Sequence, residues 1–326
     1  MARPETAPSP DVPPIEAPGG GRARSRARRA GPGWVARRRR IHLAFTLPAA
    51  AFYVWLVLWP TVQAVRYSIT DWDGLSPTFN EVGLGNYRRL AGNDAVFAQA
   101  VGNSLKFMLA VVIGQTIVSL VLALALQRNT RTNVALRAIY FFPTVLSSVS
   151  VAFVWLFVYD PTFGLANTVL SAVGLEQWRQ PWLGDQGMAI FYLAVVQIWF
   201  HAGQMMVVYI AGLQTIPTEM YESAAIDGAG PWQRFRYVTW PLIAPATAIV
   251  VAYTTIQSFK AFDLIFASTQ GGPNHATEIL STLIYHTAFR NFEFGYAAAQ
   301  SVVFVLVIAA VTLLQRRATA LTTGRA

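Results

Sequence analysis

TEMYESAAIDGAGPWQRFRYVTWPLIAP, residues 218–245, is the stretch that decides how this sequence folds. It is a polar interruption between two long apolar runs. Thr218 is a suitable N-cap for a helix, and acidic residues follow in the first turns, where the helix dipole favours them. Gly228 is a natural left-handed stop, and Gly230-Pro231 can start another helix because Pro suits the first helical position. We therefore predict a helix, a glycine turn and a second helix that lie outside a membrane and form a docking surface.

The composition is that of a membrane protein. The chain has 326 residues, of which 54% are hydrophobic and only 13% charged, and its mean hydropathy is +0.40. A soluble protein carries roughly a quarter of charged residues. The sequence contains no cysteine, which excludes disulfides and thiolate metal sites.

Six apolar segments are long enough to cross a hydrocarbon core, which takes ~20 residues of helix. They are residues 42–65, 101–126, 136–159, 188–213, 242–261 and 296–314. The expected fold class is therefore an all-α polytopic membrane protein with six transmembrane helices.

The chain ahead of the first segment has a different character. Residues 1–40 are rich in Pro, Ala, Gly and Arg, and we expect a disordered basic cytoplasmic tail. Ten of the 25 lysine and arginine residues lie there, so the net charge of +9 does not indicate a nucleic-acid-binding fold. An RNA- or lipid-binding arm is the alternative to a tail that fixes orientation. A secretory signal does not fit, because five more apolar runs follow.

Basic residues between the segments predict the orientation. With the N-terminus inside, 18 basic residues lie on the inner side and 5 on the outer side. Because positive charge is retained in the cytoplasm, this bias places both chain ends and the stretch at 218–245 on the cytoplasmic side. The predicted organisation is a tail at 1–40, a first helix with its outer loop at 41–98, a core at 99–317 and a second cytoplasmic tail at 318–326.

The stretch at 218–241 resembles the EAA loop of the permease subunits of bacterial ABC importers. That pattern reads Glu-Ala-Ala, Gly, an apolar residue and Pro, and here it is Glu222-Ser223-Ala224, Gly228, Val238 and Pro241. Ser223, Val238 and Trp240 stand where Ala, Ile and Leu are usual. The fuller form YExAxIDGA, at 221–229, is similar to the carbohydrate branch, the maltose and glycerol-phosphate type.

The resemblance covers about residues 99–317 and implies a type I ABC importer permease fold with a cytoplasmic coupling helix. It also implies a bacterial plasma membrane location, a second permease subunit, two cytoplasmic ATPase subunits and an extracytoplasmic sugar-binding protein. The residues that it assigns to ATPase coupling are Tyr221, Glu222, Ser223, Ala224, Asp227, Gly228, Ala229 and Pro241. An amphipathic loop without a partner is the alternative.

Catalytic and cofactor motifs are missing from the sequence. Lys106 and Lys260 are the only lysines, and neither stands in a Gly-rich phosphate-binding loop. The four histidines show no HExxH spacing, and no G-x-S-x-G motif occurs. We therefore expect no catalytic residue, metal or cofactor, and ATP hydrolysis in partner subunits. A membrane enzyme is disfavoured.

Polar side chains inside the apolar segments mark a candidate substrate pathway, because such groups are costly against lipid. Gln197, His201 and Gln204 share one helical face, and Thr254 and Ser258 share another. Uncharged amides and hydroxyls suit a neutral polyhydroxylated solute. The candidates are Gln197, Phe200, His201, Gln204, Thr254 and Ser258. Interhelical hydrogen bonding is the alternative for the polar ones, and a position facing lipid is the alternative for Phe200. We expect Lys260 and Asp263 to lie at the membrane interface, with Lys260 snorkelling.

The leading hypothesis is an ATP-driven sugar importer permease, which forms half of the pathway. A secondary transporter driven by an ion gradient is the alternative, but it needs carboxylates within the membrane, and none of the six segments has a central Asp or Glu. The outer loops either receive a soluble partner or merely connect helices.

Overall fold

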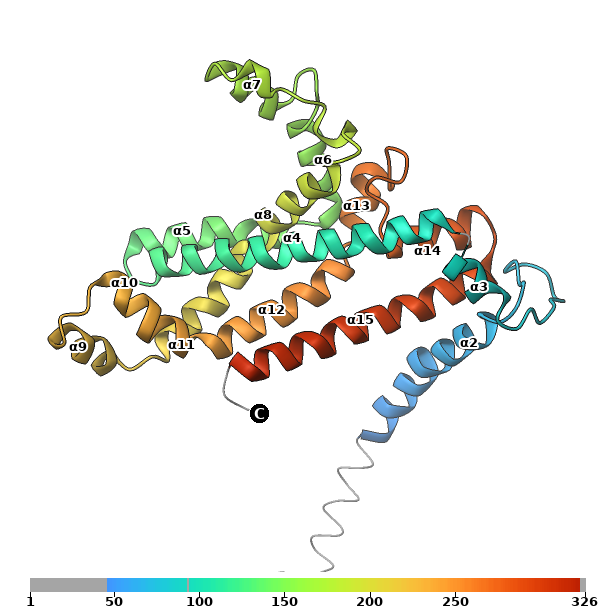
Figure 1. Cartoon of the computed structure of the whole chain (residues 1–326), viewed down its shortest axis with the longest axis horizontal. Helices are drawn as coiled ribbons and strands as arrows, with labels where there is room; N and C mark the ends of the chain where they lie inside the picture. Colours follow the sequence, from blue (N-terminus) through green and yellow to red (C-terminus); the bar gives the residue numbers. More distant parts are fainter. Residues whose placement is uncertain (1–45, 93, 323–326) are drawn as a thin grey trace, which may run out of the picture. The chain divides into compact units, whose positions relative to one another are not determined.

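The computed structural model describes residues 46–92 and 94–322, and these form helices and loops with no β-strand. The contacts within the chain divide it into two units, and the boundary in the sequence lies between Leu58 and Trp59. The elements named in Figure 1, with the shorter turns, are η1 Val54–Leu58, α2 Trp59–Tyr67, α3 Gly85–Gly92, α4 Ala95–Leu126, α5 Arg131–Phe141, η2 Phe142–Val145, α6 Ser148–Val158, α7 Leu165–Ala172, η3 Glu176–Trp178, η4 Trp182–Gly184, α8 Ala189–Gln214, α9 Thr218–Ile226, α10 Pro231–Arg234, η5 Phe235–Thr239, α11 Trp240–Leu242, α12 Ala244–Phe259, α13 Phe262–Thr269, α14 Leu280–Tyr285, η6 His286–Arg290 and α15 Phe294–Thr322. The predicted tail at 1–40 lies outside the described residues.

Four helices are long and apolar enough to cross a membrane, and two bent helix pairs raise the number to six. The four are Thr46–Tyr67, Ala95–Leu126, Ala189–Gln214 and Phe294–Arg317, and the pairs are Arg131–Val145 with Ser148–Val158 and Pro231–Leu242 with Ala244–Phe259. The all-α polytopic class with six segments is therefore confirmed, but the third and fifth segments are broken rather than single helices.

The third segment breaks at Pro143. The α5 helix tightens there into the turn η2, and Leu146 and Ser147 are extended before α6 begins. The two parts meet at an angle of 102°. Proline has no N–H to donate and its ring clashes with the preceding turn, so a helix ends or bends at such a position. The prediction of one helix over 136–159 was wrong for this reason.

The fifth segment is bent by 65° between Leu242 and Ala244. Residues 218–245 do not run into the fifth segment as an irregular loop. The second half, from Pro231, is already helical and runs through α10, η5 and α11 to the bend. Pro245 lies at the start of α12, where its missing N–H costs nothing, and Pro241 lies just after the π-helical turn η5.

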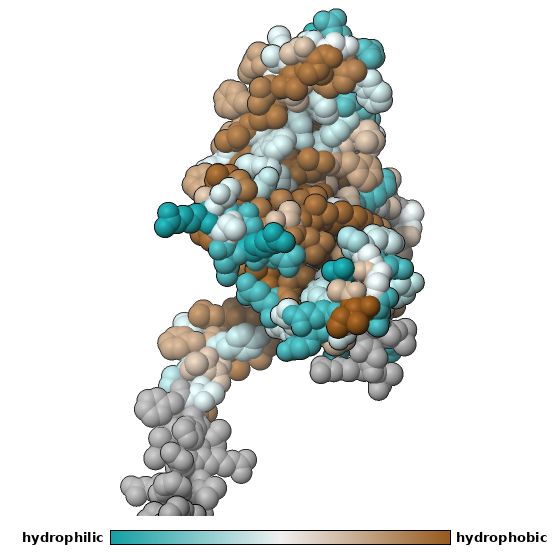
Figure 2. Space-filling view, turned by 90° about the vertical axis from the view of Figure 1, so that its left-hand side faces the viewer, coloured by the Kyte–Doolittle hydropathy of each residue, from teal (hydrophilic) through white to brown (hydrophobic). Residues whose placement is uncertain are grey.

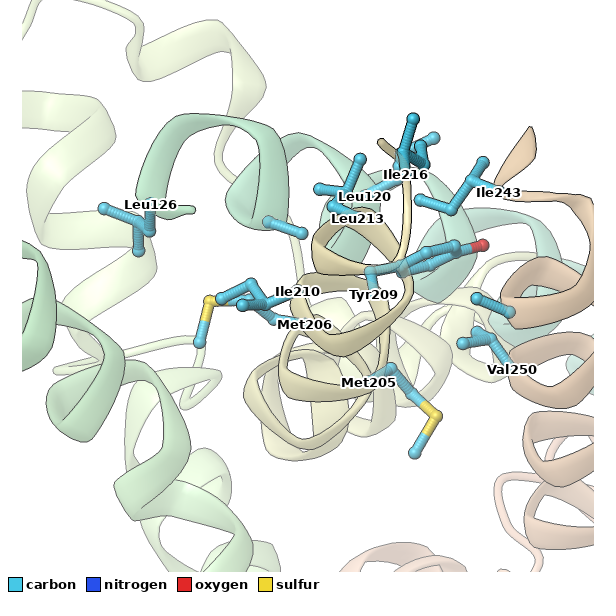
Figure 3. Packing of buried hydrophobic residues seen from close by; sticks show 12 residues of the cluster. Leu120, Leu126, Met205, Met206, Tyr209, Ile210, Leu213, Ile216, Ile243 and Val250 are labelled. Atoms are coloured by element: carbon cyan, nitrogen blue, oxygen red, sulfur yellow. The ribbon is translucent and has the colours of Figure 1, made fainter. Parts of the chain in front are cut away.

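The core lies where α4 packs against α8 and both pack against α12. Tyr209 is completely buried and points from α8 toward Val250 and Ile243 of the neighbouring helical segment (Figure 3). The cluster contains Leu120, Ala123, Leu126, Met205, Met206, Tyr209, Ile210, Leu213, Ile216, Ile243, Ala246 and Val250. This cluster joins the ends of three spans into one packed body next to α9.

The outward faces of the spans are apolar as well. On α4, Val111 is fully buried, whereas Ile113 and Ile117 are more than half exposed. A helix that is hydrophobic on all sides is typical of a membrane span, because lipid replaces water around it. Figure 2 views the molecule from the end that carries α9 and shows hydrophilic residues gathered there beside broad hydrophobic surface.

The segment between α13 and α14 is fastened to α4. Asn103 donates hydrogen bonds of 3.0 Å from its amide to the backbone oxygens of His275 and Glu278. The hydroxyl of Ser104 accepts a hydrogen bond of 3.0 Å from the N–H of Leu280. The carboxylate of Glu278 is buried between His275 and His286, each with Nδ1 3.2 Å from a carboxylate oxygen. At the far end of the chain α15 continues to Thr322, past the predicted end of the sixth segment.

Candidate functional site

The first arm of the predicted loop is α9, and it ends as a glycine-capped helix. Gly228 has φ +76°, the left-handed conformation that glycine adopts most easily. The N–H of Gly228 donates to the oxygen of Ala225, and the N–H of Ala229 donates to the oxygen of Ala224. This pair of bonds satisfies the last carbonyls of the helix in a Schellman motif. At the other end the N-cap is Pro217, one residue before the predicted Thr218.

The second arm starts at Pro231. The side-chain oxygen of Gln233 accepts the N–H of Gly230 at 2.7 Å, and Arg234 donates from Nε to the oxygen of Ala229 at 2.8 Å. Both bonds lock the turn between the arms. The turn is therefore a defined joint that holds the two helices at a set angle.

Tyr221 ties the arms to each other. Its hydroxyl lies 3.0 Å from the hydroxyl of Thr239, which is buried in the second arm. Tyr221 and Phe235 also pack against the core cluster of α4, α8 and α12. The α9 helix is therefore fixed both to the second arm and to the packed ends of the spans.

The outward surface of the loop is open to solvent and mixed in character. Glu222, Ser223 and Asp227 are exposed, as are the large apolar side chains of Ile226 and Trp232, at 87% and 72%. Exposed apolar groups with a polar rim mark an interaction surface in a protein. The residues assigned to coupling thus lie together on α9 and its turn, with Pro241 exposed at the end of the second arm.

A cavity of about 260 Å³ lies among α6, α8, α12 and the start of α13. It is lined by Ser148, Gln197, His201, Tyr253, Ile256, Gln257, Lys260, Ala261, Asp263 and Leu264. The amide of Gln204 donates to the hydroxyl of Tyr253 at 3.2 Å and so positions that ring. The Nδ1 of His201 lies 3.4 Å from the oxygen of Gln197.

The predicted pathway residues separate into two groups. Gln197 and His201 line the cavity, and Gln204 contacts it through Tyr253. Phe200 is buried in an apolar cluster with Val196 and Leu264. Thr254 and Ser258 are buried, and Ser258 donates its hydroxyl to the oxygen of Thr254 at 2.8 Å within their own helix. The roles of all six in transport stay predictions.

The sequence matches the family model described as "Binding-protein-dependent transport system inner membrane component" over residues 115–320. The chain belongs to this family. It is a multi-pass membrane permease of a binding-protein-dependent transport system, and the family assigns it a transport role.

Relatives of the permease support the same assignment. It is 34% identical over 271 residues to a probable ABC transporter permease protein of Pyrococcus horikoshii, covering 83% of this chain and 92% of the relative. It is 35% identical over 256 residues to MsmF, the multiple sugar-binding transport system permease protein of Streptococcus mutans, covering 78% and 87%. A permease chain in the crystal structure of a bacterial ABC transporter that imports the acidic polysaccharide alginate shares the fold, with a TM-score of 0.75, 22% identity and coverage of 87% and 96%.

Sequence reasoning missed how much of the permease cavity comes from α12 and α13. Tyr253, Gln257 and Lys260 recur at the spacing of one helical face, and that signal was present in the sequence. Lys260 and Asp263, expected at the membrane interface, are exposed and line the cavity. Their position relative to the membrane stays a prediction.

Proposed function

We propose that this chain is the permease subunit of an ATP-driven sugar importer, and that residues 218–241 are its coupling loop to ATPase subunits. The observation that carries the proposal is the joint at Gly228. There an exposed, capped helix is bonded to the second arm and packed on a core of α4, α8 and α12, and α8 and α12 also line the cavity. A rigid lever with an exposed end suits a chain that receives motion from another subunit.

The mechanism follows from this connection. ATPase subunits that close on binding ATP would move α9, and the bond between Tyr221 and Thr239 would pass that motion to the second arm. The second arm continues through the bend into α12, which lines the cavity. Rocking of the spans would then open the cavity alternately to the two sides of the membrane. A second permease subunit would supply the other half of the pathway.

Sugar is the substrate class that the cavity and the relatives favour together. The cavity presents amide, hydroxyl and imidazole groups, and two relatives are named as permeases for multiple sugars and for starch degradation products. Hydrogen-bonding groups of this kind match a solute with many hydroxyls. An extracytoplasmic sugar-binding protein would deliver it to the outer loops. We further propose that both chain ends and the coupling loop face the cytoplasm.

The test uses two glycines that share one backbone conformation. Gly228 and Gly174 have φ of +76° and +75°, and neither has an atom within 4 Å of the position of an added Cβ. A valine is strained at either position, so the two substitutions carry the same conformational cost in the backbone. We expect Gly228→Val to insert normally and to lose uptake of radiolabelled neutral oligosaccharides by intact cells, together with co-purification of an ATPase subunit. Gly174→Val is expected to keep both, and equal behaviour of the two variants would refute the coupling role.

A further inference from the structure

The cavity lies where the helices are interrupted. Ser148 is the first residue of α6, directly after the break that follows Pro143. On the other side, α12 ends at Phe259 and α13 begins at Phe262. Helix ends leave backbone donors and acceptors without intrahelical partners. Within a membrane such backbone is tolerated where it is buried in protein or lines a polar cavity, and broken helices mark solute sites in transporters.

The inner lining is uncharged and has hydrogen-bonding capacity to spare. Gln197 is only 3% exposed and lines the cavity. The side-chain oxygen of Gln257 is buried and lacks a partner within 46–322. A buried amide oxygen without a partner is costly, so the Gln257 side chain indicates a ligand or water in the cavity.

Two opposite charges complete the lining. Lys260 and Asp263 are both exposed, and they lie three residues apart across the junction of α12 and α13. Among residues 46–92 and 94–322, neither side chain forms a hydrogen bond or takes part in the ion pairs of Arg89, His275 and His286. The ammonium of Lys260 and the carboxylate of Asp263 are therefore free to bind a solute.

We propose that Lys260 and Asp263 act as a balanced charge pair that selects an uncharged sugar ring over an anionic or a cationic one. A hydroxyl can accept from the ammonium and donate to the carboxylate, and charge-assisted hydrogen bonds of this kind are stronger than neutral ones. A phosphate or carboxylate on the solute is attracted by Lys260 and repelled by Asp263. An amino group on the solute is attracted by Asp263 and repelled by Lys260. This inference rests on the proposed role of the cavity in sugar transport and adds its substrate class.

The cavity has a volume of about 260 Å³, near the lower end of the roughly 300–1,000 Å³ of small-molecule sites, so it suits a solute as small as one sugar ring. Tyr253 offers an aromatic face beside the polar groups, which suits the apolar face of a sugar ring. A longer oligosaccharide would occupy the cavity with one unit at a time.

Because the sequence contains no cysteine, a single introduced thiol can report on the charge balance in the cavity. In the full chain in lipid nanodiscs, Ser148→Cys places one nearly isosteric thiol in the cavity. Its reaction rates are compared for anionic sulfonatoethyl and cationic trimethylammonioethyl methanethiosulfonate. We expect Lys260→Met to lower the anionic-to-cationic rate ratio by roughly five- to tenfold and Asp263→Asn to raise it by a similar factor. The double variant should return to the parent ratio.

Two control substitutions remove one positive and one negative charge at positions away from the cavity. Arg179→Met and Glu176→Gln alter exposed residues of the loop that contains η3 and should leave the ratio unchanged. Tyr253→Cys provides a second reporter if Ser148→Cys fails to insert. A ratio that does not respond to Lys260→Met or Asp263→Asn at either reporter would overturn the proposal.

Protection experiments test the solute class with three rings of equal size. Glucose, glucuronate and glucosamine at millimolar concentration compete with a neutral thiol reagent at Ser148→Cys. Glucose should protect best in the parent, glucuronate should gain several-fold in Asp263→Asn, and glucosamine should gain in Lys260→Met. Equal protection by all three, or none by any, would refute the selection. These measurements need no ATPase. If they contradict the proposed selection while Gly228→Val still loses uptake, only the role of Lys260 and Asp263 is refuted, and the importer assignment stands.

Discussion

The backbone oxygen of Tyr140 occupies the space that a Cβ on Gly203 would need. The α8 helix thus packs backbone to backbone against the end of α5, next to the break at Pro143. The hydroxyl of Thr144 reinforces this contact by donating to the oxygen of Phe200 at 2.9 Å. Small residues permit such close helix packing in membranes. The contact holds the bend of the third span, and with it the first turn of α6, against the cavity-lining helix.

Gly203→Ala should therefore destabilise the permease. The added methyl meets backbone atoms, which cannot move aside as a flexible side chain can, and overpacking of this kind costs about 1–3 kcal/mol. The measurement is the midpoint of thermal aggregation of the detergent-purified chain. Gly102→Ala is the matched control, because Gly102 is also within a span and has no atom within 4 Å. Its midpoint should be unchanged or higher, since alanine favours helix by up to ~1 kcal/mol. Equal loss in both variants would contradict the packing argument.

Removal of the Glu278 carboxylate should loosen the segment between α13 and α14. That side chain is 2% exposed and lies between His275 and His286. Removing the carboxylate leaves His286, which is 13% exposed, without this partner, and losing a buried partner in this way costs about 1–3 kcal/mol. Limited proteolysis and the thermal midpoint of Glu278→Ala report the loss.

The control for Glu278 is Glu293, which pairs with Arg89 at 3.0 Å with both side chains about half exposed. Surface pairs contribute about 0–1 kcal/mol. Glu293→Ala should therefore behave almost like the parent. If the two variants lose stability equally, burial of the Glu278 carboxylate is not the cause.

Tyr221→Phe should weaken the link between the two arms of the coupling loop without unfolding the chain. The substitution removes the hydroxyl that lies 3.0 Å from Thr239 and keeps the ring, at a cost of about 0.5–1.5 kcal/mol. We expect normal amounts of protein in the membrane and a partial loss of uptake of radiolabelled neutral oligosaccharides. Tyr237→Phe, at a position 73% exposed, should keep full uptake. A Tyr221→Phe variant with parent-level uptake would show that the motion is transmitted by packing alone.

The sidedness of the loop can be measured with single cysteines. Ser223 is exposed on α9, and Gln177 is exposed in the segment between α7 and α8. In intact cells a membrane-impermeant maleimide should label Gln177→Cys and leave Ser223→Cys unlabelled until the cells are opened. Labelling of Ser223→Cys from outside would reverse the proposed orientation and exclude contact with cytoplasmic ATPases.

Local rules predicted the coupling loop well. The stop at Gly228 and the restart at Pro231 follow from backbone preferences of those two residue types, which do not depend on the rest of the chain. The same rules placed the N-cap one residue late, because Pro217 rather than Thr218 takes that position. Thr254 and Ser258 illustrate the limit of spacing as a guide. Their separation of four puts them on one face, but packing decides what that face meets.

The sequence by itself determined the six apolar segments, the glycine joint and the family, because hydrophobicity, backbone preference and motif are properties of neighbouring residues. The tertiary structure alone decided that Lys260 and Asp263 line the same cavity as Gln197. That outcome depends on where α12 ends and on how α6 turns after Pro143. Helix breaks of this kind are stable only when the surrounding helices satisfy the exposed backbone, so they cannot be located from one segment considered alone.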